Sequence, residues 1–125
     1  MAKKKSMKID ANVKAIVDEL NLWPGIYTMS SCGGHVKITN VSQYPEGDFF
    51  VCFHVEVLEG GWRSLQAIAF AVDRCDDFKK LVILVWCAGD DPETMAFQLK
   101  GVDHASPDSL AKCLREFREP SLKKN

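Results

Sequence analysis

The sequence lacks a hydrophobic run long enough to form a membrane-spanning helix. Its longest apolar run, Leu81 to Ala88, is strand-sized, whereas a helix that crosses a bilayer needs about 18 apolar residues. No apolar segment follows the lysines near the N-terminus, so the start of the chain does not read as a secretory signal. We therefore predict no membrane association and a cytoplasmic location.

The cysteines lack the pattern of a disulfide framework. There are five, an odd number, and no pair has the Cys-x-x-Cys spacing. Without an export signal, this usage predicts free thiols in a reducing compartment. The five are Cys32, Cys52, Cys75, Cys87 and Cys113.

The chain also lacks a strong overall charge, with a formal net charge of -1. The first eight residues hold four lysines and no acidic residue, which leaves 12 basic and 17 acidic residues, a net charge of -5, in the remainder. Domains that bind nucleic acids normally present a basic surface. The acidic body therefore argues against tRNA as a partner, and we expect the basic tail to be a solvated terminus.

The length and composition predict one globular domain. Two separate cores within 125 residues would each be marginal, and 46% hydrophobic with 26% charged residues is an ordinary globular balance. We predict a flexible basic tail over residues 1–8, a single domain over residues 9–119 and a C-terminal tail over residues 120–125.

Hydrophobic periodicity predicts alternating groups of helices and strands. Helical spacing follows Asp10, which can cap a first helix, and recurs in Trp62–Asp73. A last helix is expected to start at Ser106, as its cap, and to end at Pro120. The expected strands are Ile26–Ser31, Asp48–Leu58, Leu81–Cys87 and Thr94–Val102, with a further short strand at Val36–Thr39.

This order, α-β-β-α-β-β-α, predicts an α+β fold in which helices pack on one face of a mostly antiparallel sheet. Both halves follow a ββα order, which would fit a structural pseudo-repeat, although their sequences do not match. We expect the tryptophans, Trp23, Trp62 and Trp86, in the core or at its edge. Exposed sheet edges also suggest a homodimer.

The most unusual segment is residues 28–35, Thr-Met-Ser-Ser-Cys-Gly-Gly-His. Small polar residues end a strand there, and two glycines permit a positive φ and a close approach to a ligand. Such a turn can direct N–H groups at a small anion or at an adenosyl ligand. The alternative is a tight hairpin turn whose hydroxyls satisfy the backbone. The candidate ligand-binding residues are Ser30, Ser31, Cys32, Gly33 and Gly34.

The same region suggests a zinc site. Cys32 and His35 are spaced as Cys-x-x-His, and Cys52 and His54 project from one face of the next strand. If the two strands are neighbours, these four side chains could form the tetrahedral set that zinc requires. The alternative is that Cys52 and His54 are ordinary sheet residues.

Cys32 also allows nucleophilic chemistry. Paired with His35 or His54, it could supply a thiolate–imidazole pair, and Glu56 could orient the histidine. The alternative is a free thiol without a catalytic role.

Residues 27–35 resemble the Ser-Ser-Cys-Ser-Gly-Arg signature of the wybutosine-synthesising methyltransferase family. Four residues match the signature, namely Ser30, Ser31, Cys32 and Gly34. Gly33 stands where serine is usual, and His35 stands where arginine is usual. The turn is also similar to the Ser-Cys-x-Gly-His turn of short bacterial proteins that have no assigned activity.

The resemblance extends over about residues 26–87, and His54 matches the His-Val strand of the family. That family uses S-adenosylmethionine to modify a guanosine of phenylalanine tRNA. It implies a methyltransferase-like domain for tRNA modification, with His54 or His35 as general base or substrate contact. Replacing the fixed cation of arginine by His35 favours a related fold over a retained reaction. The alternative is a non-enzymatic zinc-stabilised or protein-interaction module.

Overall fold

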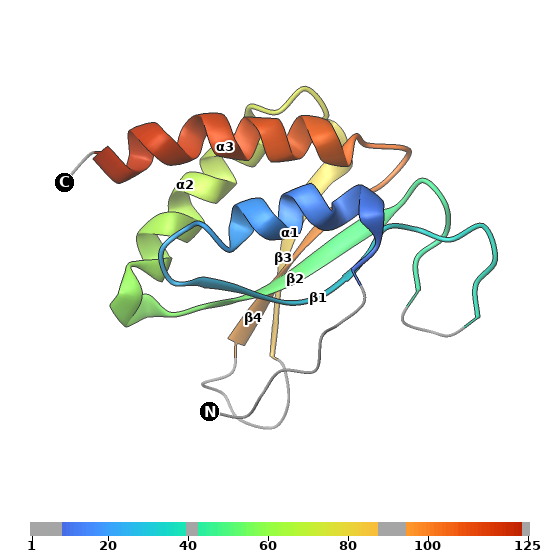
Figure 1. The fold of residues 1–125 in the computed structure, drawn as a ribbon, viewed down its shortest axis with the longest axis horizontal. Coiled ribbons are helices and arrows are strands. Elements are labelled where there is room, and N and C mark those ends of the chain that lie inside the picture. Colours follow the sequence, from blue (N-terminus) through green and yellow to red (C-terminus); the bar gives the residue numbers. More distant parts are fainter. Residues whose placement is uncertain (1–8, 40–42, 88–94, 124–125) are drawn as a thin grey trace.

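The computed structural model describes residues 9–39, 43–87 and 95–123, and its elements follow the predicted order (Figure 1). The helices are α1 (Lys14–Leu20), α2 (Gly61–Asp73) and α3 (Pro107–Lys123). The strands are β1 (Ile26–Cys32), β2 (Phe49–Val55), β3 (Leu81–Cys87) and β4 (Met95–Gly101). Short 3-10 segments are η1 (Ala11–Val13), η2 (Val57–Glu59) and η3 (Phe78–Lys80). The basic tail expected over residues 1–8 lies outside the described residues.

The four strands form one antiparallel sheet in the order β1-β2-β4-β3. The strands β1 and β3 are therefore its edges. All three helices lie on one face of the sheet (Figure 1), which confirms the predicted α+β architecture. None of the helices in the described part of the chain combines the length and apolar character that a bilayer crossing requires.

The core lies between the helices and the sheet face that they cover. The rings of Phe53 on β2 and Phe97 on β4 stack in its centre, 5.8 Å apart. Trp23 is buried as expected, whereas Trp62 is 53% exposed and contributes little to the core. The side chain of Trp86 lies outside the described part of the structure. The largest fully buried side chains include Ile16, Leu20, Val51, Ile68, Leu99, Leu110 and Leu114.

A bulge in β1 exchanges the faces to which its side chains point. The pairing with β2 shifts between Thr28 and Ser30, so Met29 is the extra residue. Before the bulge, Thr28 pairs with Phe53 on the helix-covered face; after it, Cys32 pairs with Phe50. Cys32 therefore lies on the open face, buried in a small cluster with Phe50, Cys52 and Tyr44.

Three element boundaries differ from the sequence-based expectation. β2 ends at Val55 rather than at Leu58, because the Glu56 carbonyl accepts a hydrogen bond from the N–H of Gly61. Residues 36–39 form no strand; next to them only an isolated bridge joins His35 to Pro45. The last helix continues through Pro120 to Lys123. The proline removes the hydrogen bond to the carbonyl four residues earlier but does not end the helix.

A buried ion pair holds α1 against α3. The Arg118 Nε lies 2.5 Å from the Glu19 Oε2, and only 7% of the Glu19 side chain is exposed. A buried carboxylate is costly unless a cation and hydrogen bonds compensate it. This pair therefore fixes the position of α1 more than it adds net stability.

We predict that Arg118→Met strongly destabilises the protein because it leaves the Glu19 carboxylate buried without a cation. The free energy of unfolding, measured by urea titration, should fall by about 3–5 kcal/mol. The double variant Glu19→Leu/Arg118→Met removes both charges and should recover most of that loss. A single variant as stable as the parent would contradict the buried pairing.

Packing between α2 and α3 disfavours ionisation of the Cys113 thiol. Its Sγ donates to the carbonyl of Ala71 on α2 at 3.2 Å. Burial, followed by the proximity of Cys75, raises the pKa of the Cys113 thiol to about 11. The resulting stabilisation is complete below the ordinary thiol pKa and is lost as the pH rises through about 11. With Cys32, Cys52 and Cys75, this residue is a free cysteine.

We predict that Cys113 alkylates at least about tenfold more slowly in the folded protein than in the urea-unfolded chain at pH 8.5, because only the thiolate reacts. Iodoacetamide labelling followed by peptide mass mapping measures both rates. Equal rates in the two states would show that the thiol is not protected by packing.

Candidate functional site

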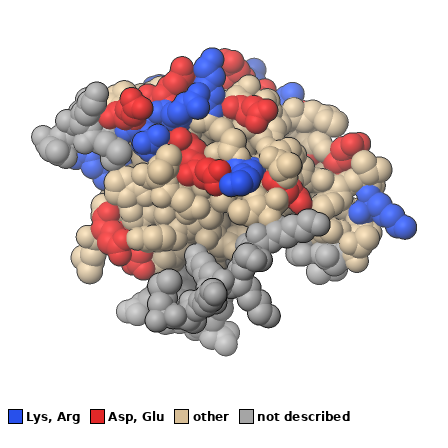
Figure 2. Space-filling view, in the orientation of Figure 1, with Lys and Arg blue, Asp and Glu red and all other residues tan. Residues whose placement is uncertain are grey.

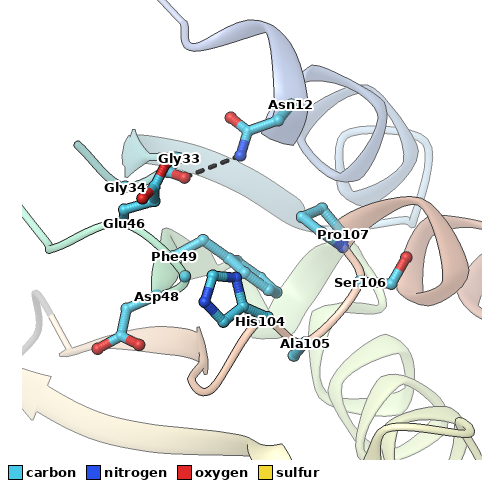
Figure 3. Close-up of a pocket in the computed structure, with 11 residues that line it drawn as sticks. Asn12, Gly33, Gly34, Glu46, Asp48, Phe49, His104, Ala105, Ser106 and Pro107 are labelled. Atoms are coloured by element: carbon cyan, nitrogen blue, oxygen red, sulfur yellow. Dashed lines mark hydrogen bonds between the residues drawn. The ribbon is translucent and has the colours of Figure 1, made fainter. Parts of the chain in front are cut away.

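A pocket of about 470 Å³ opens at one end of the sheet, beside the turn that contains Gly33 and Gly34, the double-glycine turn (Figure 3). Four chain segments form it. They are η1, the turn after β1, the approach to β2 and the connection from β4 into the start of α3. Its lining residues are Asn12, Gly33, Gly34, Glu46, Gly47, Asp48, Phe49, His104, Ala105, Ser106 and Pro107.

The sheet register explains why these segments meet. Cys32 at the end of β1 pairs with Phe50, and Phe49 at the start of β2 pairs with Gly101 at the end of β4. A side chain at Gly101 would lie 2.2 Å from the Phe49 ring. Glycine is therefore needed at position 101, where it leaves room for the ring that lines the pocket.

His104 is held in the pocket by an unusual backbone. Asp103 and His104 both adopt positive φ values, 54° and 61°, a region that few non-glycine residues occupy. The His104 N–H donates to the Gly47 carbonyl at 2.7 Å, and the Asp103 N–H donates to Asp48 Oδ1 at 3.3 Å. A Cβ at Gly47 would lie 2.8 Å from His104 Nε2, so the imidazole packs directly against the glycine backbone. Such strained positions concentrate at functional sites.

The start of α3 forms another wall of the pocket. The Ser106 Oγ accepts from the Ser109 N–H at 3.1 Å, which confirms the predicted serine cap. The Ser106 N–H donates to the Asp77 carboxylate at 2.7 Å. Because these helix-end donors are already paired, the wall offers little to an anionic ligand.

The peptide of Gly33 connects the turn to the N-terminal segment. Its N–H donates to Asp10 Oδ2, and its carbonyl accepts from Asn12 Nδ2, both at 2.8 Å. Asp10 precedes η1 but makes no side-chain cap hydrogen bond, so the capping role expected from the sequence is wrong. The Asp10 carboxylate accepts a hydrogen bond from the distant Gly33 N–H instead of from the N–H groups at the start of η1.

The residues singled out in the sequence are distributed over several places. Gly33 and Gly34 line the pocket. Cys32 and His35 lie near Asp10, with one ligand atom from each within 4.8 Å of the others. Ser30 pairs with Cys52 and Ser31 with Val51 on β2, and neither serine lines the pocket.

Neither His54 nor Cys52 belongs to this ligand group of described residues, although Cys52 lies in the same small cluster as Cys32. His54 Nε2 is 2.9 Å from Glu56 Oε1 near the other end of β2. Cys52 is buried, and its Sγ accepts from Gln98 at 3.7 Å. Within the described residues, the candidate metal group therefore contains Cys32 and His35 but neither Cys52 nor His54.

Several pocket residues have no direct signal in the sequence. Asn12, Asp48 and His104 come from three separate segments and belong to no spaced motif. The adjacent Ser106–Pro107 helix start indicates where α3 begins. It gives no sign that His104 has a positive φ.

Comparison of the chain with known protein families, curated proteins and solved structures finds no match. The resemblance to the wybutosine-synthesising family therefore stays a prediction from residues 27–35 and the nearby sequence.

We predict that Gly34→Ala destabilises the protein more than Gly60→Ala. The two glycines have similar φ values, 92° and 83°, so alanine meets a similar left-handed penalty of about 1–2 kcal/mol at each. A Cβ at Gly34 would also lie 2.5 Å from the Asp48 carbonyl oxygen, whereas the nearest atom to one at Gly60 is 3.5 Å away. Urea unfolding compares the two, and equal losses would show that the turn at Gly34 relaxes freely.

Proposed function

We propose that this protein binds a small nucleoside-containing molecule, of the adenosyl class, in the pocket beside Gly33 and Gly34. The observation that carries the proposal is the pocket itself, about 470 Å³ in volume and built against the predicted turn. Small-molecule sites commonly have volumes of about 300–1,000 Å³.

The polar walls suit a ligand that donates hydrogen bonds. Asn12 uses its amide nitrogen on the Gly33 carbonyl, and its Oδ1 lies over the Gly33 Cα, where a Cβ would approach it to 1.8 Å. Glu46 and Asp48 add two carboxylates to the lining. Ribose hydroxyls and amino groups can donate to such oxygens, whereas a free inorganic anion would be repelled.

The remaining walls suit a flat ring. His104 is exposed and can present its ring to a ligand, whereas Phe49, labelled beside it in Figure 3, is only 2% exposed and supports the pocket from the core side. Aromatic side chains provide stacking surfaces for nucleobases, worth about 1–3 kcal/mol per base. Of the two ligand classes suggested by the turn, the lining therefore favours an adenosyl compound over a small anion.

The proposal does not include an RNA partner. On the face shown in Figure 2, basic and acidic side chains are interspersed, and no continuous basic surface of the kind that RNA-binding domains use is visible there. Methyl transfer to tRNA, which the family resemblance implies, would need binding of the cofactor first. Cofactor binding is therefore the property to test.

We predict saturable, one-to-one binding of S-adenosylmethionine or S-adenosylhomocysteine to the full chain, measured by isothermal titration calorimetry and native mass spectrometry. His104→Asn should weaken binding at least about tenfold by removing the stacking ring. Asparagine tolerates the positive φ at this position, so the backbone should be preserved. Inorganic phosphate should not compete.

The control is His54→Asn, the same substitution at a histidine outside the pocket. It should bind as the parent does, and both variants should keep the parental melting temperature within a few degrees. Absence of saturable binding by the parent would contradict the proposed function. Loss of binding in His54→Asn with retention in His104→Asn would place the ligand near the other end of β2 instead.

A further inference from the structure

Three side chains from two segments of the chain converge next to the pocket. Asp10 precedes η1, Cys32 ends β1, and His35 follows the double glycine. One ligand atom from each lies within 4.8 Å of the other two. His35 Nε2 lies 3.4 Å from Asp10 Oδ2.

Main-chain hydrogen bonds orient two of the three ligand atoms. The Gly33 N–H donates to Asp10 Oδ2 at 2.8 Å, and the Tyr44 N–H donates to Cys32 Sγ at 3.3 Å. The third residue, His35, is anchored through its own N–H, which donates to the Tyr44 carbonyl at 2.8 Å. Outer hydrogen bonds of this kind orient the ligands around protein-bound metals.

The donor set selects the kind of ion. A carboxylate oxygen, a cysteine sulfur and an imidazole nitrogen are ligands of zinc and similar borderline-soft cations, while magnesium and calcium prefer oxygen alone. Around a tetrahedral zinc with bonds of about 2.0–2.3 Å, ligand atoms lie roughly 3.3–3.8 Å apart. The three atoms need only a small contraction to reach that spacing, and Asp10 and His35 are each 32% exposed and can adjust.

The same three residue types could instead form a cysteine nucleophile with its histidine and acid. A reactive cysteine needs access to its substrate. Cys32 is only 4% exposed and packs against Phe50, Cys52 and Tyr44 on the open sheet face. Burial therefore favours a ligand role for this sulfur over a nucleophilic one.

We propose that Asp10, Cys32 and His35 bind one zinc-type divalent cation that links the start of the N-terminal helical segment to the end of β1. Three protein ligands leave a fourth coordination position for water or another small ligand. The site is distinct from the pocket but shares the Gly33 peptide with it. It replaces Cys52 and His54, expected from the sequence, with Asp10.

The test uses the full, untagged chain, freed of metal by chelation and titrated with Co²⁺. We expect one equivalent to bind with the visible absorption of a four-coordinate site and a thiolate charge-transfer band, and Zn²⁺ to displace it. The variants Asp10→Asn, Cys32→Ser and His35→Gln should each weaken binding at least tenfold, and Cys32→Ser should abolish the thiolate band.

The matched controls are Cys52→Ser and His54→Gln, which change the same residue types outside the group. Cys52 lies in the same small cluster as Cys32, so its substitution perturbs the packing of that cluster without removing a ligand. Both controls should bind Co²⁺ as the parent does. If Cys32→Ser fails to fold, Asp10→Asn at the more exposed position decides the question.

Two results would overturn the site. One is a parent chain that shows no cobalt spectrum at stoichiometric metal. The other is binding that survives Asp10→Asn and His35→Gln but is lost in Cys52→Ser or His54→Gln. Neither result depends on S-adenosylmethionine binding, so the metal site and the pocket can fail separately.

Discussion

The attachment of the N-terminal segment to the Gly33 peptide is the constraint on which the rest of this end of the molecule depends. The Asp10 carboxylate accepts from the Gly33 N–H, and the Asn12 amide donates to the Gly33 carbonyl. A Cβ at Gly33 would lie 1.8 Å from Asn12 Oδ1, so any larger residue there would displace the Asn12 amide from this position. These contacts set both the pocket wall and the position of Asp10 beside Cys32.

The N-terminal segment is held at both of its ends. Near its start, Asp10 and Asn12 fix it to the turn after β1. Near its end, the buried Glu19 is paired with Arg118 of α3. Since α3 also begins at the pocket, the segment and this last helix together frame the site, and a change in their packing would alter the pocket's shape.

Much of the fold could be predicted because its signals are local. Apolar spacing placed the helices and the main strands, and Ser106 marked the start of α3 as observed. The capping role predicted for Asp10 was wrong. A carboxylate before a helix can accept from the local N–H groups, but Asp10 accepts from Gly33, 23 residues away. The helix end predicted at Pro120 was wrong for the same reason, because that prediction used only the local propensity of proline.

The candidate site could be predicted only in part. The double glycine is visible as a motif, and both glycines line the pocket. The positive φ of His104 and the convergence of Asp10 with His35 arise from tertiary packing. No spacing rule in a single sequence encodes such contacts between distant segments.

The bulge at Met29 interrupts the alternation of side chains between the two faces of β1. Side chains in a strand alternate with a period of two, so one extra residue exchanges the two faces for everything that follows. If the same residues ran through β1 without a bulge, the Cys32 thiol would point toward the helices and the Ser31 hydroxyl would lie on the open face. The chemistry presented beside the double-glycine turn is thus set by this bulge as much as by the identity of the residues.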